Sequence, residues 1–158
     1  RRVPDGDLGS LEPDAYDVVL SAFTFDNVPG LDRKTAILRG LRRAMRPGGR
    51  MVNLVSAPDI YLHEWLSFST KDFPENRAAR SGDVVRIVML DVDDARPVED
   101  VLCKEEDYLE AYAAAGLDVV DTLRPLGRAS EPFAWVTETR VSPWLIHVLS
   151  RGGSHAGP

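Results

Sequence analysis

The chain has 158 residues, of which 44% are hydrophobic and 28% charged, a composition that suits one folded domain in water. The net charge of −6 argues against a nucleic-acid partner, because nucleic-acid-binding faces are basic. No apolar stretch approaches the roughly 20 residues of a membrane span. The single cysteine, Cys103, excludes an internal disulfide and fits a reducing compartment. We therefore expect a cytoplasmic protein that binds no nucleic acid or membrane.

The first elements along the chain are a loop and a buried strand. Residues 1–15 are predicted to be a loop, because prolines and glycines interrupt any periodicity. Residues 18–25 are mostly apolar at consecutive positions, which is typical of a strand buried on both faces of a parallel sheet. Polar and turn-forming residues at 26–30 end this strand.

A helix and a second strand follow. Asp32 is a predicted N-cap, and apolar residues recur at helical spacing up to Met45. Pro47, Gly48 and Gly49 are predicted to stop the helix, and residues 50–55 form the next strand. A strand, a helix of about four turns and another strand favour a right-handed βαβ unit.

The central part of the chain has a weaker pattern. A helical segment that includes Trp65, Leu66 and Phe68 is expected after Pro58. Residues 84–90 are predicted to form a strand that pairs with residues 98–102 as a hairpin. The aspartates between these two strands lack the glycine and glutamate of a calcium loop, so we expect a solvated turn and no metal site.

The last elements are a helix and two strands. Acidic residues at 105–107 favour a helix N-terminus, and Gly116 is predicted to end the helix. A strand begins at Leu117, and residues 144–149 form the final strand. Residues 151–158 are expected to be a disordered tail.

The elements with the clearest pattern follow one another as YDVVLSAFTF, LDRKTAILRGLRRAMRPGG, RMVNLVS, CKEEDYLEAYAAAG, LDVVDTL and WLIHVL. In this order they resemble the class I S-adenosylmethionine-dependent methyltransferases. The resemblance implies an α/β, Rossmann-like methyltransferase sheet over residues 1–150. The elements match its C-terminal part, strands four to seven with their helices, and the mixed sheet ends in an antiparallel hairpin. It also implies an S-adenosylmethionine cofactor and methyl transfer to a small-molecule substrate. The glycine-rich GxGxG turn of the family is not in this sequence.

The resemblance assigns cofactor contacts to five residues. Asp5 and Gly6 stand where the family places an acidic and a small residue that contact the adenine, although Asp-Gly is also a common turn pair. Backbone carbonyls near Ser21 and Ala22 would face the methionine end of the cofactor. Phe23, or Phe25 in its place, would pack against the cofactor's cation, and the alternative is that both rings belong to the core.

Five further residues are candidates for catalysis and substrate binding. Asp26 and Asn27 would orient the substrate, with Asp26 placed among the catalytic residues, or would cap a turn. His63 would act as a general base, or is a surface residue. Trp65 and Trp135 would line the substrate pocket, and Trp135 has the alternative of an interface position.

A second function remains open at this point: a non-catalytic binding or assembly module. A strand buried on both faces needs neighbours, and in the family the first three strands supply them. We therefore expect the chain to form a homodimer through residues 17–25, or to pair with a partner that supplies the missing N-terminal strands.

Overall fold

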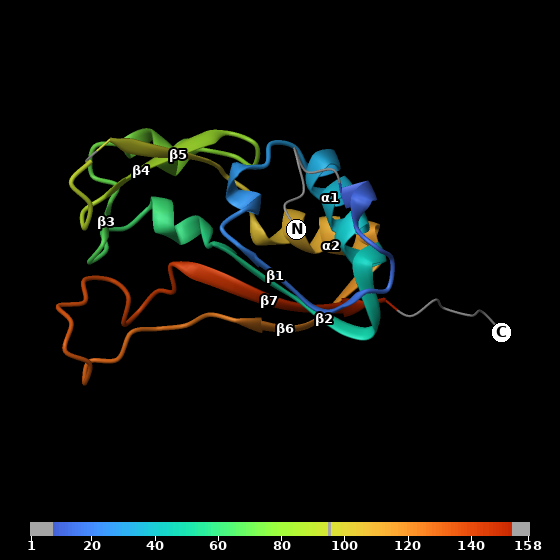
Figure 1. Ribbon diagram of the computed structural model, residues 1–158. Helices are drawn as coiled ribbons and strands as arrows, with labels where there is room; N and C mark the ends of the chain where they lie inside the picture. The colour runs from blue at the N-terminus through green and yellow to red at the C-terminus, as the bar shows by residue number, and fades with distance from the viewer. Residues whose placement is uncertain (1–7, 95, 153–158) are drawn as a thin grey trace.

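The computed structural model describes residues 8–94 and 96–152. These residues form a four-stranded sheet and a smaller, three-stranded sheet beside it (Figure 1). The larger sheet has the order β1-β2-β7-β6, in which β1 and β2 are parallel and β7 is antiparallel to both of its neighbours. This arrangement confirms the predicted mixed sheet with a closing antiparallel hairpin. Its strands are β1 (Tyr16–Ala22), β2 (Met45–Ser56), β6 (Leu117–Leu123) and β7 (Trp144–Arg151).

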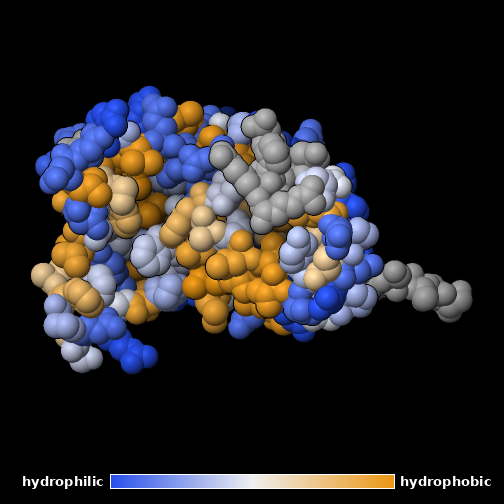
Figure 2. All heavy atoms as spheres, viewed as in Figure 1, coloured by the Kyte–Doolittle hydropathy of each residue, from blue (hydrophilic) through white to orange (hydrophobic). Residues whose placement is uncertain are grey.

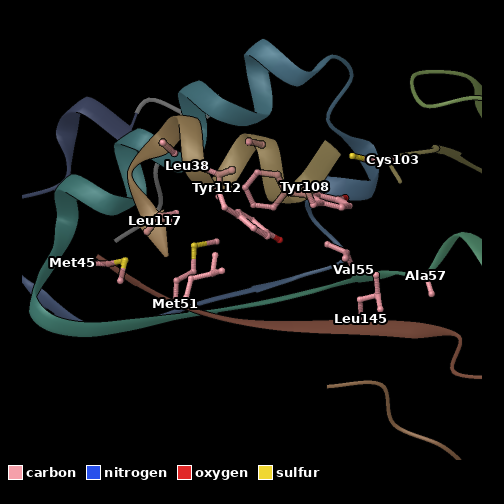
Figure 3. Close-up of a cluster of buried hydrophobic side chains, with 14 residues drawn as sticks. Leu38, Met45, Met51, Val55, Ala57, Cys103, Tyr108, Tyr112, Leu117 and Leu145 are labelled. Atoms are coloured by element: carbon pink, nitrogen blue, oxygen red, sulfur yellow. The ribbon is translucent and has the colours of Figure 1, made fainter. Parts of the chain in front are cut away.

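Two α-helices cover one face of this sheet. Helix α1 (Leu31–Ala44) connects β1 to β2, and α2 (Glu105–Ala115) precedes β6. The main core lies between the helices and the sheet (Figure 3). Alternate residues of β2 and β7 point toward the helices, as a strand's period of two requires. The buried side chains drawn in Figure 3 include Leu38, Met51, Val55, Tyr108, Tyr112, Leu117 and Leu145.

The opposite face of the sheet is not covered by any described helix (Figure 1). Leu20 stands beside Val52, and Val52 beside Val148, so their side chains share this face. Val18 and Leu20 are 64% and 71% exposed. Figure 2 shows a hydrophobic area over β1 on the side that faces the viewer. We call Val18, Leu20, Val52 and Val148 the uncovered face.

The exposure of β1 corrects the prediction of a strand buried on both faces. In the described residues β1 pairs only with β2, so one of its edges is open. The strand also ends at Ala22, earlier than predicted, and Phe25 lies in a short 3-10 helix instead. The apolar side chains of β1 would be buried on both faces of a complete sheet. The described elements bury them on one face only.

The start of α1 differs from the prediction. Gly30, with φ of 76°, is the N-cap, and Asp32 lies inside the first turn without a capping hydrogen bond. The backbone conformation at this position is one that glycine adopts without strain, which explains why a glycine precedes the helix. In the first turn, the negative charge of Asp32 still interacts favourably with the positive end of the helix dipole.

The Pro-Gly-Gly segment belongs to β2 and does not stop α1, as the sequence had suggested. The helix ends at Ala44, and β2 begins at Met45. The pairing of β1 with β2 shifts between Tyr16 and Val18, so residues 46–49 form a bulge in β2. A Cβ at Gly49 would lie 3.1 Å from the carbonyl oxygens of Tyr16 and Asp17. Glycine is therefore required by the close approach of the two strands.

The end of α2 agrees with the prediction. Gly116 ends the helix with φ of 73°, in the left-handed region. Arg42 of α1 donates a hydrogen bond to the Gly116 carbonyl at 2.7 Å and thereby ties the two helices together. Strand β7 continues to Arg151, whose guanidinium donates to the Met45 carbonyl at 2.7 Å. Of the predicted tail, residues 153–158 lie outside the described residues.

The second sheet is formed between β2 and α2 in the sequence. Its order is β3-β4-β5 and both pairings are antiparallel, which confirms the predicted hairpin. A separate small core, with Ile60, Trp65 and Val85, supports it. Its strands are β3 (Phe68–Ser69), β4 (Val84–Met89) and β5 (Pro97–Val101).

The helical segment expected after Pro58 is shorter than predicted. It is a 3-10 helix of four residues, and Trp65 lies beyond it. Among the described helices none is both long and apolar enough to cross a bilayer. The 3-10 helices span Leu8–Ser10, Phe25–Asn27, Pro58–Tyr61 and Pro74–Ala78.

Candidate functional site

The candidate site lies where β1 and β2 end and β7 begins. Open α/β sheets generally bind ligands at the carboxyl ends of their parallel strands. Three segments meet at this edge: residues 23–30 after β1, residues 57–70 after β2, and residues 125–143 between β6 and β7. They build two features, a buried polar cluster around Asp26 and a pocket lined by tryptophans.

Asp26 links the loop after β1 to the end of β2. Its side chain is 4% exposed and accepts hydrogen bonds from the Ser56 N–H at 3.2 Å and from the Ser56 hydroxyl at 3.1 Å. The Tyr108 hydroxyl donates to it at 3.4 Å. Burial raises the pKa of Asp26 to about 6, against the lowering effect of the Ser56 N–H, and the nearby Asp100 adds to the increase.

Other buried polar groups surround Asp26. The Tyr61 hydroxyl donates to Asp100 at 3.0 Å, and burial raises the pKa of Asp100 although this hydrogen bond lowers it. Lys34 donates to the Phe25 carbonyl, and its Nζ lies 5.4 Å from the centroid of the Tyr108 ring. Burial lowers the pKa of Lys34, although the neighbouring Asp26 opposes that change. The cluster therefore holds acidic and basic groups whose charges depend on one another.

The second feature is a cavity of about 210 Å³, which we call the tryptophan pocket. All three tryptophans of the chain line it. The cavity lies between the segment after β2 and the connection from β6 to β7. The lining side chains that matter most for recognition are Trp65, Phe68, Glu131, Trp135, Glu138 and Trp144.

Hydrogen bonds and close contacts hold the tryptophan rings in place. Trp65 donates from Nε1 to the Ile60 carbonyl at 2.8 Å, and Trp135 donates from Nε1 to Glu131 at 3.1 Å. The Trp135 ring also lies directly against Gly127, where a Cβ would come within 2.8 Å of ring atom Cε2. Only glycine leaves room for the ring in this position.

Phe23 joins the end of β1 to the tryptophan pocket. Its ring contacts that of Trp144 edge-on, with the centroids 6.0 Å apart. Its backbone φ is 54°, a conformation that is uncommon for a bulky residue. Such outliers gather at functional sites, where the surrounding structure holds them. The loop after β1 and the pocket therefore form one continuous region.

Of the three predicted substrate residues, two line the tryptophan pocket and one does not. Trp65 and Trp135 come together in the tryptophan pocket, although 70 positions separate them in the sequence (135 − 65). Asn27 is exposed and does not line that pocket; its amide donates to the Phe23 carbonyl at 3.4 Å and closes the loop. Trp65 is 2% exposed and also belongs to the small core, so Trp135 offers the larger ring surface, and the role of both tryptophans in substrate binding stays a prediction.

The predicted catalytic pair is not brought together by any contact in the described residues. His63 lies beside Trp65, with ring centroids 6.1 Å apart, and its Nε2 is 4.0 Å from Asp59. It does not line the tryptophan pocket. Asp26 is buried behind the loop and bonded to Ser56. Its position shows a role in holding the loop, and the assignment of His63 as a base stays a prediction.

The predicted cofactor residues fall into two groups. Asp5 and Gly6 lie outside the described residues. The Ser21 side chain points into the core, because Ser21 stands beside the buried Asn53 on the helix-covered face. Ala22 and Phe23 are exposed at the end of β1. The backbone of this strand end and the ring of Phe23 are therefore the parts available for a ligand.

Several residues of the site were missed in the sequence. Ser56 anchors Asp26, and Glu131, Glu138 and Trp144 complete the tryptophan pocket. The sequence predicts Trp144 only as the start of a strand. A useful signal was the clustering of Glu131, Trp135 and Glu138 in a long connection, since long ordered loops carry function. In the described ranges no three histidines, cysteines or carboxylates converge as metal ligands do.

Comparisons with known proteins identify the architecture. A protein from Listeria monocytogenes, assigned as an S-adenosylmethionine-dependent methyltransferase, superposes with a TM-score of 0.60 at 15% identity, over 91% of this chain and 65% of that one. The CcbJ methyltransferase from Streptomyces caelestis superposes with a TM-score of 0.56 at 14% identity, over 90% of this chain and 64% of that one. The chain has the class I S-adenosylmethionine-dependent methyltransferase fold.

A third structure supports the same fold assignment. It is a methyltransferase of this kind from Methanosarcina mazei, with a TM-score of 0.56 at 10% identity, over 90% of this chain and 62% of that one. The chain thus spans less than two thirds of the length of these proteins. No protein-family model matches the sequence, and the search of curated proteins finds no match.

Proposed function

We propose that this chain carries the acceptor side of an S-adenosylmethionine-dependent methyltransferase that acts on a small molecule. The observation that carries the proposal is the continuity of the tryptophan pocket with Phe23 at the carboxyl end of β1. In an open α/β sheet this edge is where a ligand binds. The fold of the solved methyltransferases supports this choice of chemistry.

The described residues fit one end of the cofactor. When bound, S-adenosylmethionine supplies a methyl group on a positively charged sulfur. The exposed ring of Phe23 can face such a cation, and the backbone at Ala22 lies at an open strand edge. Asp5 and Gly6 keep their proposed adenine contacts. Described glycines do not form a GxGxG turn after a strand, so the described residues offer no cradle for the rest of the cofactor.

Positioning and exclusion of water are the main contributions that we assign to the protein. Methyl transfer from a sulfonium is an in-line displacement, and its rate depends on alignment of the acceptor. The tryptophan pocket would orient the acceptor, and Asp26 would hold the loop that carries Phe23. His63 remains our candidate for removing a proton when the acceptor carries one.

Calorimetric titration with S-adenosylhomocysteine, followed by transfer of a labelled methyl group to candidate acceptors, tests the proposal. A dissociation constant near micromolar and a loss of binding in Phe23→Ala are expected. A matched control is Phe133→Ala, which removes an exposed ring that contacts Trp135 but does not line the tryptophan pocket. The proposal is wrong if neither cofactor nor product binds at millimolar concentration and no methyl is transferred.

The uncovered face favours a second candidate function, a binding or assembly module. Val18 and Leu20 expose apolar side chains on an open-edged strand. Such a surface favours pairing with a second copy or with a partner that supplies strands beside β1. Association without cofactor binding would support this function, and cofactor binding by the monomer would exclude it as the sole function.

A further inference from the structure

The tryptophan pocket has a charge pattern that selects its ligand. The described residues that line it include two glutamates, Glu131 and Glu138, and no lysine or arginine. Aromatic rings attract cations through the negative potential of their faces. Aromatic rings line this pocket, and carboxylates are the only charged groups among its described lining residues. The pocket therefore favours a positively charged ligand and disfavours an anion.

Glu138 supplies a permanent negative charge. Its Oε1 accepts from the Leu66 N–H at 2.6 Å, and its Oε2 accepts from the Val136 and Thr137 N–H groups at 2.8 and 3.0 Å. Burial raises the pKa of Glu138, but these backbone donors outweigh burial and lower it below the usual value. The side chain holds the pocket wall together and contributes its charge without an open oxygen.

Glu131 offers a free oxygen. Both hydrogen bonds to its carboxylate, from the Arg128 N–H at 2.7 Å and from Trp135 Nε1 at 3.1 Å, end on Oε2. Within the described residues Oε1 accepts none. Trp135 is held on the same carboxylate, so a ligand that stacks on its ring lies within reach of Oε1.

The size of the pocket limits the ligand. A cavity of about 150 Å³ is enough for benzene in other proteins, and this one has about 210 Å³. The pocket therefore has room for one six-membered ring, and the volume beyond that of benzene admits a tail of about two or three heavy atoms. The edge of the pocket at Trp144 touches Phe23, so the bound molecule lies beside the strand end where we place the methyl donor.

We propose that the tryptophan pocket binds a small arylalkylamine in its cationic form, with the ring against Trp135 and Trp144 and the ammonium group on Glu131. This inference deepens the proposed function, on which its role as methyl acceptor depends. A protonated nitrogen has no lone pair to attack a methyl group, so the ammonium must first give up its proton, which the Glu131 carboxylate that holds it can take. The assignment of the pocket as a cation site stands on the lining residues alone.

The test uses three probes with the same ring: 2-phenylethylammonium, 2-phenylethanol and 3-phenylpropanoate. All three tryptophans line the pocket, so quenching of tryptophan fluorescence reports binding directly. At constant ionic strength the ammonium probe is expected to bind at least about tenfold more tightly than the carboxylate, with the alcohol between them. Equal binding of ammonium and carboxylate, or no quenching by any probe, would overturn the proposal.

Glu131→Gln separates the charge from the shape of the pocket. The amide oxygen can still accept from Trp135, so the fold is kept, while the negative charge is removed. Affinity for the ammonium probe is expected to fall about fivefold to tenfold and affinity for the alcohol to change less than about twofold. Glu110→Gln, at an exposed position of α2, is the matched control. An unchanged ammonium affinity in Glu131→Gln overturns the role of Glu131.

Failure of this inference can be told apart from failure of the proposed function. Binding of S-adenosylhomocysteine with no probe preference would overturn the cation site and leave methyl transfer standing. Probe preference without cofactor binding would support the cation site and count against methyl transfer.

Discussion

The carboxylate of Asp26 accepts hydrogen bonds from both the N–H and the hydroxyl of Ser56, and so fastens the loop after β1 to the end of β2. This contact joins two segments that are 30 residues apart. It buries an acidic group whose pKa is raised to about 6 from the ordinary 3.8. The stability of the fold should therefore depend on pH through this residue.

The expected sign follows from proton binding. Between about pH 4 and pH 6 the folded chain retains a proton on Asp26 that the unfolded chain has lost, so the free energy of unfolding falls as pH rises. The loss is complete by about pH 7. Relative to Asp26→Asn, the wild type should lose about 2 kcal/mol from pH 4 to pH 7. Urea unfolding of both proteins at several pH values measures this difference.

A control for the loss of one aspartate is Asp91→Asn, at an exposed position after β4. Parallel pH profiles of Asp26→Asn and the wild type would contradict the burial of an ionisable carboxyl at this contact.

The uncovered face should drive self-association. Leu20→Glu places a charge at a side chain that is 71% exposed on β1, and desolvating this charge in an interface is costly. The wild type is expected to sediment as a dimer or larger species at micromolar concentration, and the variant to need at least about tenfold more protein for the same association. Sedimentation velocity measures both.

Leu109→Glu is the matched control, because Leu109 is 41% exposed on α2, away from the uncovered face. A monomeric wild type, or the same loss of association in both variants, would show that this face does not mediate contact.

Gly116 has a left-handed backbone conformation, so replacing this glycine should lower the stability of the fold. Gly116→Ala is expected to lower the free energy of unfolding by about 1–2 kcal/mol, because φ is 73° and a Cβ is disfavoured in this region. Gly116→Asn should lose less, because asparagine tolerates this conformation better. Urea unfolding midpoints compare the two. An equal loss would assign the cost to the contact with Arg42, whose Nε lies 3.0 Å from the added Cβ in either variant.

Cys103 should react slowly in the folded chain. Burial raises the pKa of its thiol from 9.0 to about 11, although the charge of Lys34 lowers it. The reactive thiolate is therefore about 100-fold scarcer than at the ordinary pKa, before steric protection is counted. Alkylation by iodoacetamide at pH 8 should be at least that much slower in buffer than in denaturant. Comparable rates would mean that the site opens readily at the start of α2.

The order of elements could be predicted from local pattern alone. The helical spacing before Met45, the glycine after α2 and the β-branched run of β4 each correspond to an element of the structure. Boundaries were less accurate where backbone pairing overrides local preference. The Pro-Gly-Gly segment joined β2 as a bulge because β1 passes close enough to require Gly49.

The candidate site was predicted only in part. The family resemblance points to Trp65, in the segment after β2, and the sequence places Trp135 between the last two strands. The structure puts both in the lining of one pocket. The sequence could not show that Trp144 completes this pocket, because its strand position is decided by pairing with Ser56 across the sheet. Likewise, the burial of Asp26 depends on Ser56 and Tyr108, which are remote along the chain.

By itself the sequence determined the α/β class, the succession of strands and helices along the chain, and the apolar character of β1, because these depend on periodicity, turn residues and local hydrophobicity. The mixed sheet followed from the family resemblance. The tertiary structure alone decided which face of β1 is covered and how Trp65 comes to share one cavity with the remote Trp135 and Trp144. The reason is physical: burial, charge balance and ring contacts arise between segments that only the packed sheet brings together.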